Sequence, residues 1–399
     1  MSVRYDLRWR ALIIPEHSSP GVYVEEIKIG TKPIEGVSTS TAGMVGVTTK
    51  GPLNTPTMIA SFKEFSRLFG GYLDEDYGED RYLPHAVEGF FQNGGKRVYV
   101  SRIEATKDSC RDASYIGVCD PEPHKRTGLQ TLKNIDEISI IAVPGGTSRA
   151  IQHAMISQCE QMKDRFAVLD SEKDSDPDKI QEQRSHYDSK YAALYYPWLV
   201  IRDPFSSGAI SIPPSGHICG IYARSDMNHG VHKAPANENI IGVNGLERRI
   251  TKVKQDALNL IGINCLRAFR GRGIQVWGAR TTSSDSLWKY VNVRRFITYL
   301  EESIEVGTRW VVFEPKDEKL WARVKQSITQ FLTREWRSGA LMGVTPEETF
   351  FVKCDRTTMT QDDIDNGRLI AIIGVAPIKP VEFIIFRISK LAVGSETTE

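Results

Sequence analysis

Residues 137–170, EISIIAVPGGTSRAIQHAMISQCEQMKDRFAVLD, decide the class of fold. The apolar run at 137–145 predicts a strand, the apolar spacing at 150–163 predicts a helix, and RFAVLD at 165–170 predicts a second strand. A strand, a helix and a strand of these lengths are typical of a βαβ unit, whose two strands lie parallel. We therefore expect a mixed fold, α/β or α+β, with a partly parallel sheet.

The composition changes on both sides of this unit. The chain has 399 residues, of which 40% are apolar and 25% charged, as in an ordinary globular protein with two or three domains. Residues 105–136 are polar, and residues 215–237 read as a turn-rich passage. These changes predict one α/β domain at about 105–236.

Other segments carry local signals for helices and strands. SFKEFSRLFG at 61–70 predicts a helix with Ser61 as N-cap, Glu64 at the capping-box position and Gly70 as its end. The spacing at 283–307 predicts a second helix. The remaining runs predict strands at WVVFEP (310–315), ETFFVKCD (348–355), LIAIIGVAPI (369–378) and VEFIIFRISKL (381–391).

Charge, hydropathy and cysteine content argue against several classes of protein. Lys and Arg total 51 against 50 Asp and Glu, whereas a nucleic-acid-binding protein usually has a basic excess. No stretch of about 18 apolar residues predicts a membrane span. The six cysteines form no CxxC pair, and the apolar run ALII near the start is too short for a signal peptide. We expect a protein that folds and assembles in the cytoplasm, without inserting into a membrane.

Motifs for catalysis or metal binding are weak. GGKR at 94–97 lacks the first glycine of a phosphate-binding loop, and neither GxGxxG nor GxSxG occurs. RAFRGRG at 267–273 reads best as a turn before a strand. A zinc site is conceivable but disfavoured by its spacing, and its candidate ligands are His217, Cys219, His229 and His232. An α/β hydrolase or NTPase without a recognisable motif remains the alternative function, and a nucleic-acid-binding module is a third.

The helix predicted at 316–337, KDEKLWARVKQSITQFLTREWR, sorts its charges unusually. One face is apolar, through Leu320, Val324, Ile328, Phe331 and Leu332. A second face carries five cations and no carboxylate: Lys316, Lys319, Arg323, Arg334 and Arg337. We call these five residues the basic stripe, and we expect it to contact a partner.

The last predicted strand is apolar on both faces, and its members are Val381, Phe383, Ile384, Ile385, Phe386 and Ile388. An apolar strand near a chain end must be covered, either by its own domain or by strand addition to a neighbouring chain. The same requirement for cover applies to the predicted strand VYVEEI at 22–27, near the other end of the chain.

Many passages, in order over about 20–390, resemble the contractile tail sheath family, which includes the sheaths of phage tails, R-type bacteriocins and extracellular contractile injection systems. The resemblance is carried by SPGVYVEEI, NGGKRVYVSRI, PPSGHICGIYARSD, KAPANENIIGVNGLE, GIQVWGARTTSSDSLWKYVNVRRFITYLEESI, WVVFEPKDEKLW and VAPIKPVEFIIFRI.

The resemblance implies a structural protein rather than an enzyme. Family members stack as hexameric rings around an inner tube, contract from a metastable extended state without a cofactor or nucleotide, and drive the tube through a target envelope. The implied partners are further copies of the chain, the inner tube protein, baseplate and terminal cap proteins, and possible paralogous sheath proteins, with no nucleic acid.

The resemblance also implies a domain plan. A tube-facing core of residues 31–104 and 237–380 would carry an inserted outer α/β domain at 105–236. Residues 1–30 and 381–399 would be arms that donate strands to neighbours. The implied donor residues are Val22, Tyr23, Val24 and Glu25 at one end and Val381, Phe383, Ile384, Ile385, Phe386 and Ile388 at the other. The basic stripe would face the inner tube.

Overall fold

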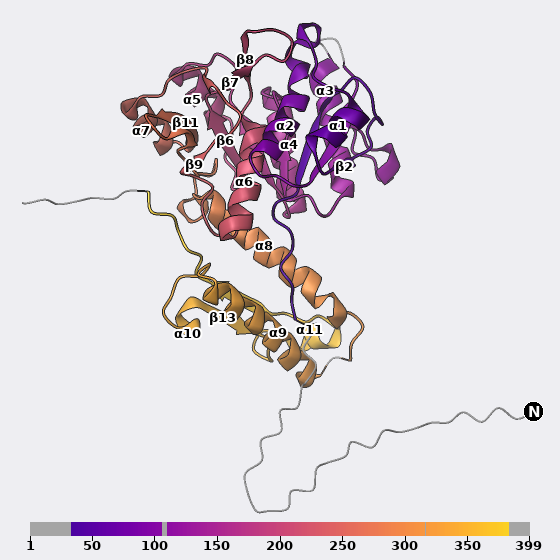
Figure 1. The fold of residues 1–399 in the computed structure, drawn as a ribbon. Helices are drawn as coiled ribbons and strands as arrows, with labels where there is room; N and C mark the ends of the chain where they lie inside the picture. The colour runs from indigo at the N-terminus through magenta and orange to yellow at the C-terminus, as the bar shows by residue number, and fades with distance from the viewer. Residues whose placement is uncertain (1–32, 106–109, 316, 383–399) are drawn as a thin grey trace, which may run out of the picture.

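The structure is a computed structural model, and it describes residues 33–105, 110–315 and 317–382. A large sheet with helices on both faces forms the larger unit, and a smaller unit of helices and a two-stranded sheet lies at one end of it (Figure 1). The long helix α8 (Val291–Thr308) runs from the larger unit into the smaller one.

Within the described residues the large sheet has nine strands, of which the central six are mutually parallel and the outer three antiparallel to their neighbours. In spatial order the strands are β2 (Thr57–Ile59), β3 (Val98–Ile103), β1 (Ala42–Val47), β4 (Ile140–Ala142), β5 (Phe166–Asp170), β6 (Ala192–Tyr196), β11 (Ile263–Phe269), β12 (Gly273–Val276) and β9 (Glu238–Asn239). The predicted βαβ unit is confirmed, since β4 and β5 pair in parallel and α4 (Arg149–Met162) connects them.

Helices cover both faces of this sheet, so its central strands are buried on both sides. One face packs against α1 (Phe62–Phe69), α2 (Leu83–Gln92) and α6 (Ser215–His229). The other face packs against α3 (Arg111–Ile116), η4 (Gly128–Asn134), α4, α5 (Pro177–Ser185) and α7 (Lys252–Leu260). The unit also contains η1 (Glu75–Tyr82), η3 (Pro123–Lys125), η5 (Ser286–Trp288) and a small sheet of β10 (Gly245–Leu246), β7 (Leu199–Arg202) and β8 (Ala209–Ile212).

The short helix α1 follows its sequence signals closely. The Ser61 hydroxyl accepts a hydrogen bond from the Glu64 amide at 3.2 Å, and the Glu64 carboxylate accepts one from the Ala60 amide at 2.9 Å. Gly70 ends the helix with a φ of 95°, a backbone conformation that favours glycine. The predicted start and end are therefore confirmed.

Helix α6 corrects one prediction, because residues 215–229 of the expected turn-rich passage form a buried helix. Its glycines allow very close packing against α2. A Cβ on Gly216 would lie 2.3 Å from the Ala86 carbonyl oxygen, and a Cβ on Gly220 would lie 2.4 Å from the Phe90 carbonyl oxygen. The glycines that read as turn signals therefore serve helix–helix contact.

The sheet also corrects the predicted domain boundaries. Strands β1 and β3 from the 31–104 segment, β4–β6 from the 105–236 segment and β11 from beyond 236 all belong to one sheet. Residues 105–236 are therefore not a separate inserted unit in the described structure. The polar passage after residue 105 forms short helices and loops that cover the sheet, which explains its change in composition.

The smaller unit is built mainly from the C-terminal part of the chain. Its elements are the second half of α8, η6 (Arg309–Val311), α9 (Glu318–Arg337), α10 (Pro346–Thr349), β13 (Phe350–Lys353), α11 (Gln361–Asp365) and β14 (Ile372–Val375). From the N-terminal side, Ile34 is buried in its core, and the Val37 amide donates to the Ser303 hydroxyl at 3.1 Å. Described residues from both sides of the large sheet's sequence, Ile34 and Val37 before it and 309–375 after it, thus contribute to the smaller unit.

The WVVFEP strand prediction is wrong. Residues 309–314 instead form a 3₁₀ turn and a reversal between α8 and α9, and Phe313 is fully exposed there. The β-branched and aromatic residues gave a strand signal, but they have no partner strand in the described structure.

Candidate assembly interface

The two units are joined by a buried ionic cluster. Arg295 on α8 donates to both carboxylate oxygens of Asp226 on α6, at 3.0 and 2.6 Å, and also to the Thr39 carbonyl at 2.8 Å. The Thr39 hydroxyl donates to the same carboxylate at 2.7 Å. The side chains of Arg295 and Asp226 are almost fully buried, so this ion pair holds α8, α6 and the chain at residue 39 together at a site shielded from water.

Helix α9 forms as predicted, with Asp317 as its N-cap and an apolar face buried in the core of the smaller unit. The Asp317 carboxylate accepts a hydrogen bond from the Leu320 amide at 2.7 Å. All five residues of the predicted apolar face are buried: Leu320, Val324, Ile328, Phe331 and Leu332.

The basic stripe is divided by contacts within the chain. Arg323 pairs with Glu314 at 3.3 Å and lies over the Trp310 ring. Arg334 donates to the Ile34 carbonyl oxygen. Lys319 and Arg337 are exposed, whereas Lys316 lies outside the described residues. Lys319 and Arg337 are therefore more accessible to a partner than Arg323 and Arg334, which make contacts within the chain.

Most of the predicted strand-exchange residues lie outside the described residues. This applies to Val22, Tyr23, Val24, Glu25, Phe383, Ile384, Ile385, Phe386 and Ile388. Val381 is described, and 80% of its surface is exposed.

The two-stranded sheet of β13 and β14 presents an apolar surface. The strands pair antiparallel, and within the described residues neither belongs to a larger sheet. Phe351 on β13 and Ile372 on β14 remain about half exposed. A two-stranded sheet with open edges is marginal on its own and accepts further strands readily.

Sequence reasoning missed an anchor that we call the Glu382 cradle, formed by Arg280, Lys289 and Tyr290. Arg280, 5% exposed, donates to both carboxylate oxygens of Glu382 at 2.8 and 2.6 Å. Lys289 and the Tyr290 hydroxyl reach the same carboxylate at 3.4 and 3.1 Å. Burial opposes ionisation, but these hydrogen bonds and charges lower the pKa of Glu382. No local sequence signal could reveal this anchor, because its residues are about 100 positions apart.

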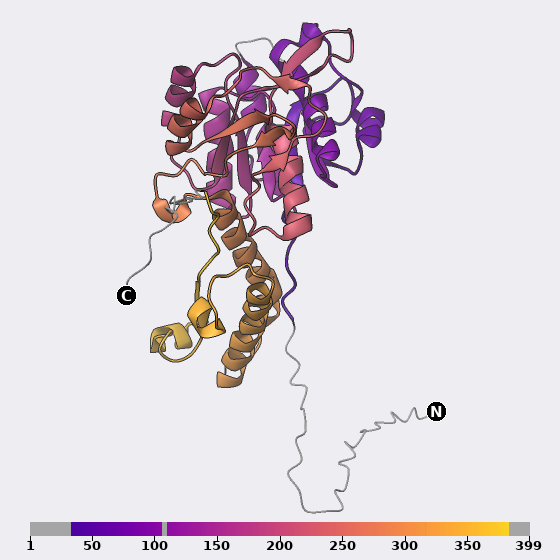
Figure 2. The ribbon, with the colours of Figure 1, turned by 60° about the vertical axis from the view of Figure 1, so that its left-hand side comes forward.

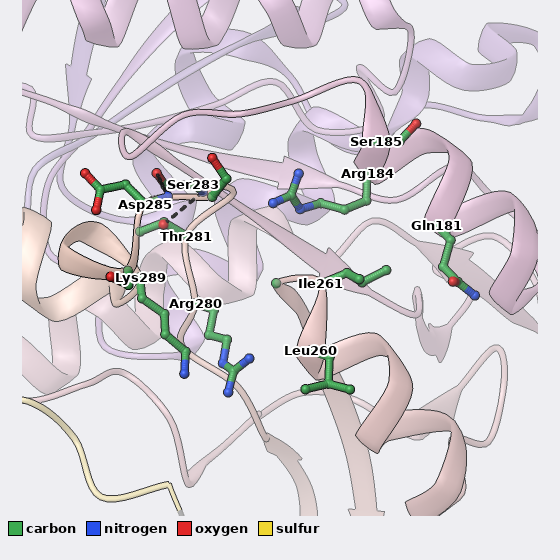
Figure 3. A pocket seen from close by; sticks show the side chains of 13 residues that line it. Gln181, Arg184, Ser185, Leu260, Ile261, Arg280, Thr281, Ser283, Asp285 and Lys289 are labelled. Carbon is green, nitrogen blue, oxygen red and sulfur yellow. Dashed lines mark hydrogen bonds between the residues drawn. The ribbon is translucent and has the colours of Figure 1, made fainter.

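The cradle borders an open pocket of about 530 Å³, which Arg280 and Lys289 help to line (Figure 3). Figure 2 shows that the chain returns from the smaller unit to the larger one before it reaches this point. The C-terminal segment therefore starts from the larger unit.

The candidate zinc ligands do not converge. His217 lies against α2 at Gly89, Cys219 is in the core of the larger unit, His229 is exposed at the end of α6, and His232 packs edge-on against Phe296. Burial lowers the pKa of His217 to about 4. Among the described residues, no cluster of three His, Cys, Asp or Glu side chains is placed to hold a metal ion.

RAFRGRG begins in β11, continues through the hairpin turn and ends at Gly273, the first residue of β12, so the predicted turn before this strand is confirmed. Within the described part of the chain, no helix has the length and apolar character needed to cross a membrane.

Comparison with known protein families identifies the family to which this architecture belongs. Residues 127–282 match the phage tail sheath protein central domain, and residues 283–389 match the phage tail sheath C-terminal domain. The chain belongs to the phage tail sheath family. The resemblance inferred from the sequence is confirmed.

Solved structures and a curated relative agree with this assignment. The sheath protein is 32% identical to a chain of the anti-feeding prophage baseplate, with a TM-score of 0.75 over 94% of this chain and 99% of that one. It is 29% identical to a chain of the PVC sheath complex, an extracellular contractile injection system in the contracted state, with a TM-score of 0.76 over 94% and 98%. The tail sheath protein of Escherichia phage P2 is 22% identical, over 92% of this chain and 94% of its own length. The sheath protein is thus a structural subunit of a phage tail or injection-system sheath.

Proposed function

We propose that this sheath protein polymerises as stacked rings of six copies around an inner tube. The polymer contracts from a metastable extended state and drives the tube through a target envelope. One observation carries the proposal: the chain is similar, over nearly its whole length, to a chain of a contracted injection-system sheath. The sixfold ring is suggested by the relative from a baseplate whose structure was sixfold symmetrised. The role is structural, with no catalysis and no cofactor.

The terminal arms, residues 1–30 and 381–399, add strands to neighbouring subunits. The open two-stranded sheet of β13 and β14 supports this proposal, because added strands would pair its edges and cover Phe351 and Ile372. Main-chain hydrogen bonds of this kind persist while subunits rotate as bodies, provided that the arms bend near their roots.

The smaller unit faces the inner tube, and the larger unit lies outside it. Lys319 and Arg337 support this orientation as exposed cations on one face of α9. Each exposed ion pair contributes only about 0 to 1 kcal/mol, so the contact depends on repetition along the tube. Further partners are the inner tube protein, baseplate and cap proteins and possible paralogous sheath proteins, and assembly takes place in the cytoplasm.

Electron microscopy of the expressed chain tests polymerisation. We expect hollow, striated tubes from the full chain when the inner tube protein is present, and their absence would contradict the proposal. Deleting residues 383–399, which keeps Glu382 in its cradle, should abolish the tubes and leave a folded subunit by circular dichroism. Deleting only residues 392–399, beyond the predicted strand, is the matched control and should preserve them. Normal tubes from the longer deletion would refute strand exchange without touching the family assignment.

A further inference from the structure

The end of α7 and the turn after it expose apolar side chains beside the Glu382 cradle. Leu260 is 78% exposed and Ile261 36% exposed, although each is a large aliphatic residue. Both line the pocket that Arg280 and Lys289 also line, and Leu260, Arg280 and Lys289 lie toward the same side of it (Figure 3). Adjacent exposed apolar side chains with polar groups at their rim offer a surface to which an apolar segment can bind.

The cradle fixes the start of the C-terminal segment at this pocket. The Arg280 guanidinium binds the Glu382 carboxylate with two of its nitrogens. Its third nitrogen donates to the Asn259 carbonyl oxygen at 2.6 Å. One buried side chain therefore connects Glu382 to the residue that directly precedes Leu260.

The four residues after Glu382 match this surface in character. Residues 383–386 read Phe-Ile-Ile-Phe, and the charged Arg387 follows them. Four residues of extended chain span up to about 14 Å, enough to cross the neighbouring side chains from an anchor at Glu382.

We propose that residues 383–386 dock over Leu260 and Ile261 of their own chain in the unassembled subunit. The chain's own segment is favoured over a second copy, because a short tether holds it at an effective concentration in the millimolar range. Docking there covers two apolar surfaces that would otherwise promote aggregation before assembly. Incorporation into a polymer then requires the segment to leave this site. This inference concerns the free subunit and does not depend on where the segment goes afterwards.

Hydrogen exchange of the full chain, measured by mass spectrometry on the unassembled fraction, tests the proposal. We expect the amides of residues 383–386 to be protected in the wild-type chain. Leu260→Glu should raise their exchange rates by about tenfold or more, because it places a charge under the docked segment. A chain that ends at Glu382 should show faster exchange at residues 258–262.

Val253→Glu is the matched control. Val253 is 80% exposed on the same helix, but it does not line the pocket beside the cradle. Its substitution should leave the exchange of residues 383–386 at the wild-type rate. The proposal is overturned if these amides are unprotected in the wild-type chain, if both glutamate variants change them equally, or if Leu260→Glu has no effect. Protection that disappears on dilution would identify a second copy as the occupant and also overturn it.

Discussion

Removing the Asp226 carboxylate should destabilise the sheath protein strongly, because it leaves the buried Arg295 guanidinium without its ion-pair partner. In the described structure, Asp226 is the only carboxylate within ion-pair distance of Arg295, and the two side chains are 4% and 3% exposed. Breaking a buried pair by removing one partner costs about 3 to 5 kcal/mol. We therefore expect Asp226→Ala to lower the free energy of unfolding by about that amount, and the Thr39 hydroxyl loses its acceptor as well.

Urea unfolding of the unassembled subunit, followed by tryptophan fluorescence and circular dichroism, measures this change. The double variant Asp226→Ala/Arg295→Met should lose less stability than the sum of the two single variants, since it leaves no unpaired charge. A coupling free energy of at least about 2 kcal/mol is expected for contacts of 2.6 and 3.0 Å in a buried site.

Glu305→Ala is the control, because Glu305 near the end of α8 pairs with Arg309, the first residue of η6, at 3.6 Å with both side chains mostly exposed. It should change the free energy of unfolding by less than about 1 kcal/mol. If Asp226→Ala costs no more than this control, or if the coupling is near zero, the buried cluster does not stabilise the joint between the two units.

Three further predictions concern packing, pH and charge. Gly220→Ala should lower the free energy of unfolding, measured with urea, by about 3 kcal/mol, because its Cβ would lie 2.4 Å from a backbone oxygen of α2. Gly71→Ala is the control and should change this free energy little, because a Cβ there would have nothing within 4 Å. Burial raises the pKa of Asp170 from 3.8 to about 7, so the folded state keeps a proton that the unfolded state releases. As the pH rises between these two values, the free energy of unfolding should fall by at most about 1.4 kcal/mol per pH unit relative to Asp170→Asn, and parallel pH profiles would contradict this. Lys319→Glu with Arg337→Glu should weaken co-sedimentation with the inner tube without changing the melting temperature, and unaltered binding would exclude these residues from the tube contact.

Local and periodic signals predicted much of the fold. The strand–helix–strand unit at 137–170 and the apolar face of α9 were predictable, because both depend on regular spacing along a short segment. The ends of α1 were predictable because capping residues act within a few positions of one another.

Features that depend on distant contacts were not predictable in the same way. The composition change after residue 105 suggested a domain boundary, yet only the strand pairing shows that the sheet continues across it. Gly216 and Gly220 have the same sequence signal whether they form a turn or a close helix contact. The Glu382 cradle and the Arg295–Asp226 pair join residues far apart in the chain, so neither is visible without the structure.

Among the described residues, three separate segments of chain connect the smaller unit to the sheet. These are the segment that leads to Thr39, helix α8, and the segment that returns to Glu382, and each is fastened by side-chain hydrogen bonds. A single linker would allow the smaller unit to rotate relative to the larger one, whereas three spaced attachments together restrict both twisting and bending between the units. We therefore expect a force applied to the smaller unit to reach the nine-stranded sheet through all three attachments rather than through one.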